Sequence, residues 1–138
     1  MTIPLLLDTC AVLWSAGADG TSDKLDQHLM QAKAQDLQLW VSPISAWELG
    51  NLVARNRLRF GRPILAWFDE MAARAGLRQA ELNARVLAAS TELPGEMNRD
   101  PADRIIVATA REYGMRVVTR DRKILDYAAQ GHVMALEC

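Results

Sequence analysis

"IPLLLDTCAV", residues 3–12, passes from a short apolar segment through an aspartate into a helical pattern. The apolar part, residues 3–7, lacks the polar alternation of a half-exposed strand, which is typical of a strand buried on both faces of a sheet. Similar apolar runs follow at residues 37–42, 115–119 and 132–136. The sequence therefore predicts at least four strands buried on both faces.

Patterns of helical period fill the intervals between these runs. The predicted helices cover residues 9–16, 22–35, 43–55, 63–75, 83–90, 101–113 and 122–130. Ser22 is predicted to cap the second of them, and Gly76, Gly114 and Gly131 to end three others. Strands that alternate with helices indicate an α/β layer fold with a mainly parallel sheet. The loops at 17–22 and 93–99 are too short to divide the chain, so we expect one domain over residues 1–138.

Length, composition and charge restrict the class of protein. The chain has 138 residues, of which 50% are hydrophobic and 24% charged, close to the average for soluble globular proteins. Residues 3–7 are too few for a signal-peptide core or a membrane span, so we expect a cytoplasmic protein without membrane contact. A net charge of -1 gives no long-range attraction for nucleic acid, and such a partner would need a local patch. Cys10 and Cys138 show neither zinc-ligand spacing nor a reason to form a disulfide.

Four acidic residues are predicted to meet at one edge of the sheet. Asp8 directly follows the first strand, Asp121 closely follows a later one, and ligands of α/β sheets bind at the carboxyl ends of strands. Glu48 lies early in a helix that leaves the same edge. Each acid taken alone also fits a turn or a helix cap, and Glu48 after Ser45 fits a capping box.

The fourth position comes from "NRDPADRIIVATA", residues 98–110. Asp100 before Pro101 is predicted to cap a helix and to have no other role. Asp103 begins a stripe that we expect to face the core, where a carboxylate is costly without a partner. The stripe is Asp103, Ile106, Val107 and Ala110, and another face carries Arg104, Ala108 and Arg111.

Carboxylates that share one edge need something to offset their repulsion. Two unit charges about 5 Å apart repel by roughly 3 kcal/mol at an effective dielectric constant near 20. Protonation or a divalent cation would relieve this, and a purely oxygen ligand set favours Mg²⁺ or Mn²⁺. The chemistry that such a site suits is phosphoryl transfer to an activated water.

Four segments, residues 5–14, 42–52, 99–110 and 117–121, together resemble a known family in their order and spacing. The family is that of the PIN-domain ribonucleases, and the resemblance is strongest to the VapC toxins of bacterial toxin–antitoxin pairs. It implies a PIN-like three-layer fold with about four to five strands. It also implies a metal site formed by Asp8, Glu48, Asp103 and Asp121, with Thr119 in support. Cys10 departs from the Asn or His of many relatives.

The same resemblance implies an activity and partners. The expected activity is an endoribonuclease that depends on Mg²⁺ or Mn²⁺ and leaves 5′-phosphate and 3′-hydroxyl ends. The expected partners are RNA, a second copy of the chain in a homodimer, and a small antitoxin protein that holds the enzyme inactive.

Basic and aromatic residues suggest where partners bind. The densest basic segment, residues 54–63, is either a solvated helix end or an RNA contact. A second basic group near Asp121 could also contact RNA or merely pair with acids; it consists of Arg120, Arg122 and Lys123. The residues predicted to contact RNA are Arg55, Arg57, Arg59, Arg62 and Arg120.

Aromatic residues are core by default, but Trp14 and Trp47 lie close to site acids in the sequence, and one or both could line a partner site.

Two other functions fit part of the pattern. An aspartyl-phosphate phosphatase or phosphoacceptor domain also has an aspartate after its first strand, but Cys10 replaces the second aspartate of the phosphatase pattern and Lys123 fits the phosphoacceptor lysine poorly. A non-catalytic binding module with the same fold is the remaining alternative.

Overall fold

The computed structural model describes residues 2–17 and 23–138, and one sheet runs through its centre. The strands are β1 (Leu5–Leu7), β2 (Leu39–Val41), β3 (Leu77–Gln79), β4 (Arg116–Thr119) and β5 (Met134–Glu137). They lie in the order β3-β2-β1-β4-β5, and every neighbouring pair is parallel. The prediction of a mainly parallel sheet with four to five strands is confirmed.

The two edge strands differ from the sequence-based expectation. β3 was not predicted, because it has only three residues and Leu77 alone is buried, so it shows no apolar run. β5 was predicted as a strand buried on both faces, and this is wrong: all four of its residues are exposed or half-buried. Since an edge strand has a neighbour on one side only, apolar content by itself did not determine its burial.

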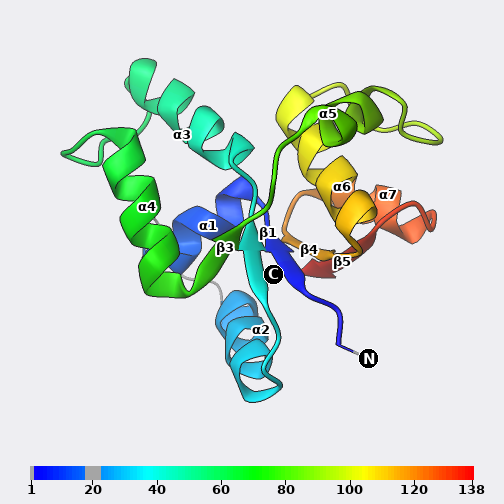
Figure 1. Ribbon diagram of the computed structural model, residues 1–138, viewed down its shortest axis with the longest axis horizontal. Coiled ribbons are helices and arrows are strands. Elements are labelled where there is room, and N and C mark those ends of the chain that lie inside the picture. Colours follow the sequence, from blue (N-terminus) through cyan, green and yellow to red (C-terminus); the bar gives the residue numbers. More distant parts are fainter. Residues whose placement is uncertain (1, 18–22) are drawn as a thin grey trace.

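Helices cover both faces of the sheet and complete three layers (Figure 1). The helices in the described residues are α1 (Thr9–Ser15), α2 (Asp23–Ala34), α3 (Ile44–Ala54), α4 (Ile64–Ala75), α5 (Ala84–Thr91), α6 (Pro101–Tyr113) and α7 (Arg122–Ala129). Each predicted helix is present, with ends shifted by at most one residue. Ser22, the predicted cap of α2, lies outside the described residues.

Side chains of the central strand enter two cores. Leu5 and Leu7 belong to the core under α1 to α4, whereas Leu6 belongs to the core under α6 and α7. This alternation follows from the pleat of a strand and explains why β1 is apolar at every position. No helix in the described residues is long and apolar enough to cross a membrane.

The helix α6 is buried more widely than one stripe. Ile106, Val107 and Ala110 are buried as predicted, but Ala108, assigned from the sequence to the other face, is also fully buried. The helix ends at Gly114, whose backbone is left-handed with φ 67°. A glycine adopts this conformation without the steric cost that other residues meet.

Candidate functional site

Asp8 begins the site at the carboxyl edge of the sheet, where β1 lies between β2 and β4. Its backbone N–H donates to Val118 O (3.1 Å), and its Oδ1 accepts the Ala11 N–H (2.8 Å) as the N-cap of α1. Its carboxyl group is buried, and burial raises its pKa despite two hydrogen bonds that lower it. Asp8 is therefore a cap, but a buried one whose charge is poorly solvated.

Thr119 joins Asp8 to Asp121. Because Leu7 pairs with Val118, the next residues, Asp8 and Thr119, lie side by side. The fully buried Thr119 hydroxyl donates to Asp8 Oδ2 (2.5 Å) and accepts the Asp121 N–H (3.0 Å). This arrangement suits the supporting role that the family resemblance implies for Thr119.

Asp121 is the N-cap of α7. Its Oδ1 accepts the N–H groups of Lys123 (2.7 Å) and Ile124 (3.4 Å). Its Oδ2 has no hydrogen bond within the described part of the chain. One oxygen of this half-buried carboxylate thus has no protein partner in the described residues.

Glu48 lies in the second turn of α3 and does not cap it. The Ser42 hydroxyl accepts the Ile44 N–H (3.1 Å) at the helix start, so the capping box of Ser45 and Glu48 is absent. Instead, the Thr9 hydroxyl donates to Glu48 Oε1 (2.5 Å) and shares a hydrogen bond with Ser45 Oγ (2.9 Å). Burial raises the pKa of Glu48, the Thr9 hydrogen bond lowers it, and the charges of Asp100 and Asp8 raise it further.

Asp100 and Asp103 have different environments. Asp100 is exposed, and its Oδ1 accepts the N–H groups of Ala102 (2.9 Å) and Asp103 (3.3 Å), which confirms the predicted cap. The half-buried Asp103 has a pKa raised to about 7, first by burial and then by the charges of Asp100, Asp121 and Glu48. Asp100 also adds to the field of the site acids, since its charge raises the pKa of both Asp103 and Glu48, but of the two aspartates only Asp103 is half-buried.

Asn98 contacts both of these aspartates and was not predicted. Its Oδ1 accepts the Asp100 N–H (2.9 Å), which fixes the amide orientation and directs its Nδ2 to Asp103 Oδ2 (3.3 Å). Arg104 donates to the carbonyl groups of Ser90, Met97 and Asn98, and so holds the loop that carries Asn98. A short amide side chain just before an Asp-Pro helix start is the signal that could have indicated it.

The Cys10 thiol lies in the electrostatic field of all four acids. Its pKa is raised to about 11 by burial and then by the charges of Asp8, Glu48, Asp103 and Asp121. All four predicted acids therefore lie near this thiol, which stays protonated at neutral pH. Cys10 and Cys138 are both free thiols.

The charges of the acids interact, but the acids do not form a closed ligand cage. In the described residues, no three acidic, histidine or cysteine side chains are close enough to hold an ion directly. The site still fits a hydrated cation, since Mg²⁺ keeps several waters and is often held by one or two carboxylates. Raised pKa values at Asp8, Glu48 and Asp103 point to negative charge that a cation would stabilise.

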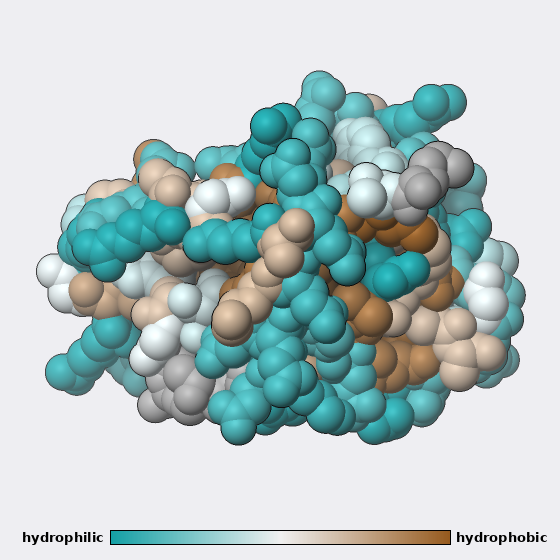
Figure 2. Space-filling model, turned by 90° about the horizontal axis from the view of Figure 1, so that it is seen from below, coloured by the Kyte–Doolittle hydropathy of each residue, from teal (hydrophilic) through white to brown (hydrophobic). Residues whose placement is uncertain are grey.

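One hollow lies away from these acids. Its volume is about 720 Å³, and it lies at the opposite edge of the sheet, where Figure 2 shows apolar surface between hydrophilic groups on the side of α6, α7 and β5. Its ionisable lining residues are Arg111, Arg116 and His132, with no carboxylate. That hollow is therefore no place for a cation, and the carboxyl edge remains the candidate site.

The predicted basic residues differ in their surroundings. Arg55, Arg57 and Arg59 are exposed, with no ion pair in the described residues. Arg62 instead forms an ion pair with Glu70 and donates to Ala66 O (2.7 Å). Arg120 lies over the Trp14 ring, 4.0 Å from its centroid. Only Arg120 lies directly beside a site residue in the chain.

The tryptophans differ in exposure. Trp47, next to Glu48 on α3, is 56% exposed, which is high for so large an apolar side chain. Trp14, Trp40 and Trp67 are half-buried, and Phe68 is buried. Trp47 is therefore the tryptophan most accessible to a partner.

Comparisons with known proteins agree with this architecture. A family model described as the PIN domain matches residues 5–130. Ribonuclease VapC22 of Mycobacterium tuberculosis is 36% identical over 124 residues, which is 90% of this chain and 91% of that protein. The crystal structure of VapBC2 from Rickettsia felis, bound to a DNA fragment from their promoter, superposes with a TM-score of 0.69 at 14% identity over 98% of both chains. FitAcB from Neisseria gonorrhoeae gives a TM-score of 0.62 at 22% identity over 96% of both chains.

Proposed function

The chain belongs to the PIN-domain family, with a VapC ribonuclease as a relative, and from this premise we propose that it is an endoribonuclease dependent on Mg²⁺ or Mn²⁺. The observation that carries the proposal is the buried Asp8, which Thr119 links to Asp121 while Glu48 and Asp103 lie in the same field. Membership in this family argues against an aspartyl-phosphate phosphatase or phosphoacceptor domain. The alternative function that an experiment must distinguish is a non-catalytic binding module.

Each acid has a role in this proposal. Asp8, Asp103 and Asp121 would hold the ion directly or through water, and Glu48 would complete the oxygen set. The chemistry that a bound ion supplies is a lowered pKa of water and neutralisation of phosphate charge. Thr119 and Thr9 keep Asp8 and Glu48 oriented by donating their hydroxyl hydrogens.

The proposed reaction is hydrolysis of an RNA phosphodiester. The oxygen of water bonds to phosphorus, the P–O3′ bond breaks, and O3′ takes up a proton. The products carry a 5′-phosphate and a 3′-hydroxyl.

Purified protein incubated with structured RNA tests this function. We expect cleavage with Mg²⁺ or Mn²⁺, none with a chelator, and a loss of activity in Asp8→Asn. End-group analysis should find 5′-phosphates. Cleavage that persists equally in Asp8→Asn would refute the site, and a folded protein that cuts no RNA under any of these conditions would favour the binding module.

Asn98→Ala is expected to weaken both Mn²⁺ binding and RNA cleavage by roughly 10-fold or more, because residues that orient metal ligands typically contribute 10- to 100-fold. Titration of the protein with Mn²⁺, followed by electron paramagnetic resonance, measures the affinity without any turnover. Asn83→Ala is the matched control: Asn83 caps α5 by accepting the Val86 N–H (3.1 Å), so its loss should lower stability and leave Mn²⁺ affinity unchanged. Equal Mn²⁺ affinities for wild type and Asn98→Ala would contradict this role.

We further propose that a small antitoxin protein covers Trp47 and that the chain forms a homodimer. Similar structures include a toxin-antitoxin complex from Klebsiella pneumoniae. An exposed tryptophan beside the site is suited to anchor a partner, since tryptophans often dominate binding energy at interfaces.

Trp47→Ala should weaken the complex with a short protein encoded beside this gene by roughly 30-fold, as expected for an interface anchor. Calorimetric titration measures this, and Leu87→Ala, at another exposed apolar residue, is the control. An unchanged affinity in Trp47→Ala would place the partner elsewhere.

A further inference from the structure

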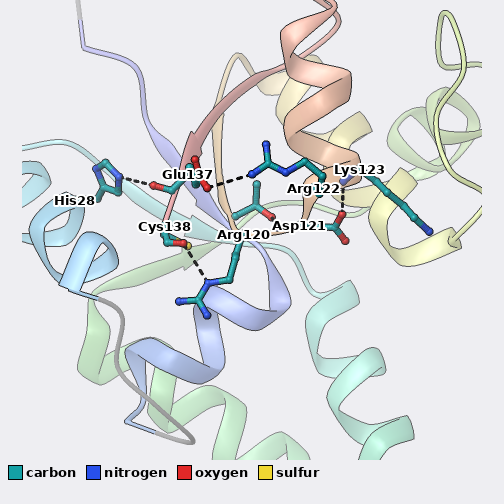
Figure 3. A network of polar contacts seen from close by, with 8 residues as sticks. His28, Arg120, Asp121, Arg122, Lys123, Glu137 and Cys138 are labelled. Atoms are coloured by element: carbon teal, nitrogen blue, oxygen red, sulfur yellow. Dashed lines mark hydrogen bonds and ion pairs between the residues drawn. The ribbon is translucent and has the colours of Figure 1, made fainter.

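Arg120 is held in place by contacts that leave its terminal nitrogens free. Its guanidinium lies over Trp14, with Cζ 4.0 Å from the ring centroid, and its Nε donates to Cys138 O (3.3 Å). Figure 3 shows the side chain directed over α1 and away from Arg122 and Asp121. In the described residues, Nη1 and Nη2 have no hydrogen-bond partner.

Several other arginines form ion pairs with acidic side chains. Arg122 pairs with Glu137 (3.4 Å), and Arg62 and Arg74 both pair with Glu70. Arg120 has no Asp or Glu partner in the described part of the chain. It is thus a fixed cation whose charge is not cancelled by an acidic side chain.

The position of Arg120 links it to the candidate site. It lies between Thr119, which donates to Asp8, and Asp121, which caps α7. Trp14 belongs to α1, the helix that Asp8 caps. Both the cation and its aromatic support are therefore attached to elements that position the site acids.

We infer that Arg120, supported by Trp14, binds an RNA backbone phosphate next to the one that is cut; this rests on the proposed ribonuclease function. A guanidinium with two free terminal nitrogens matches a phosphate bidentately. Stacking on Trp14 restricts the side chain before binding, so less conformational entropy is lost when the phosphate arrives. A carboxylate of a protein partner has similar chemistry, but the adjoining acids, as a metal site, favour the phosphodiester.

RNA binding with a chelator present tests this without cleavage. Fluorescence anisotropy of a labelled single-stranded RNA, repeated over a range of salt concentrations, should show about tenfold weaker binding by Arg120→Ala. The slope of log affinity against log salt should fall by about 0.7, the value for one lost contact to single-stranded RNA. In cleavage assays with metal, we expect KM to rise and kcat to change little, because Arg120 contacts a flanking phosphate.

Three further variants separate the contributions. Arg122→Ala removes an exposed arginine two positions away that is already paired, and we expect close to wild-type affinity and slope. Arg120→Lys retains the charge and should retain the slope while losing part of the affinity. Trp14→Leu should also weaken binding with an unchanged slope, because the charge stays while its support is lost. Thermal melting confirms that each variant is folded.

Several outcomes would overturn the inference. If Arg120→Ala binds RNA with the same affinity and salt slope as Arg122→Ala, the inference about Arg120 is wrong, while the ribonuclease proposal is unaffected. Loss of binding to a partner protein with unchanged RNA binding would assign Arg120 to that protein instead. Wild-type protein that neither binds nor cuts RNA would overturn the proposed function itself.

Discussion

Asp103→Asn is expected to lower the kcat of RNA cleavage by about 100-fold or more, while Asp100→Asn stays close to wild type. The two carboxylates belong to the same helix start, but Asp100 is exposed and uses its Oδ1 as the cap of α6. Asp103 is half-buried among the other acids and would hold the ion, and loss of a ligand should exceed the 10- to 100-fold typical for a residue that only orients one. Single-turnover cleavage of one defined RNA measures the difference.

Asp100→Asn is the matched control, because it makes the same chemical change three positions earlier. Asparagine caps helices about as well as aspartate, so this variant should also melt close to wild type. It removes one of the charges that raise the pKa of Asp103, so Asp103 should be more fully ionised and remain able to bind the ion. Comparable loss of kcat in both variants would show that the two roles are wrongly divided.

The fold was largely predictable because its strongest signals are local. β1 is apolar at each position since its residues enter two different cores, and helix ends such as Gly76 and Gly114 carry their own conformational signal. β3 was not predicted because its residues, Leu77–Gln79, show no strand pattern of their own. They form a strand because they pair with β2. A three-residue edge strand has no periodicity to detect.

That Asp8 and Asp121 meet at one edge could be predicted because topology alone brings strand ends together, whereas their role as metal ligands stays a proposal. Asp8 and Asp121 follow adjacent parallel strands, so the order of elements is enough to place them at one edge. Their hydrogen-bonding partners depend on side-chain geometry that no spacing encodes. Thr9 contacts Glu48 from another helix, and Asn98 contacts Asp103 from a loop held by Arg104.

Charge runs were the least informative signal. The segment of residues 54–63 is basic in sequence, but its arginines differ: Arg62 shares Glu70 of α4 with Arg74, whereas the other three have no ion pair in the described residues. By contrast, Arg120 stood out only weakly in the sequence and acquires its distinct surroundings from Trp14 on α1. Whether a basic residue is free to bind phosphate depends on which acids and rings the fold brings to it.

Without metal, the protein should become less stable as pH rises from about 4 to about 7. The pKa of Asp103 is raised from 3.8 to about 7, so in this range the folded state keeps a proton that the unfolded state has lost. Stability from this group is complete below the unfolded pKa and is lost as pH rises through the folded pKa. The pKa values of Asp8 and Glu48 are raised as well, and their contributions have the same sign.

Mn²⁺ should reverse this loss above pH 7 and have little effect near pH 5. An ion that binds only the folded state at about 100 times its Kd adds about 2.7 kcal/mol. For a chain of this size, that corresponds to an increase in Tm of roughly 10 °C. Near pH 5 the ion must displace protons from Asp103 and its neighbours, so its apparent affinity falls. Thermal melting at pH 5 and pH 8, with and without Mn²⁺, measures both effects.

The Asp103→Asn variant tests whether these carboxylates are responsible. Without metal, its stability should depend less on pH, and Mn²⁺ should raise its Tm less than that of wild type. The control is Asp69→Asn, at an exposed position on α4, which should match wild type. An increase in Tm that is the same at both pH values, or the same in Asp103→Asn, would mean that Mn²⁺ binds somewhere other than these carboxylates.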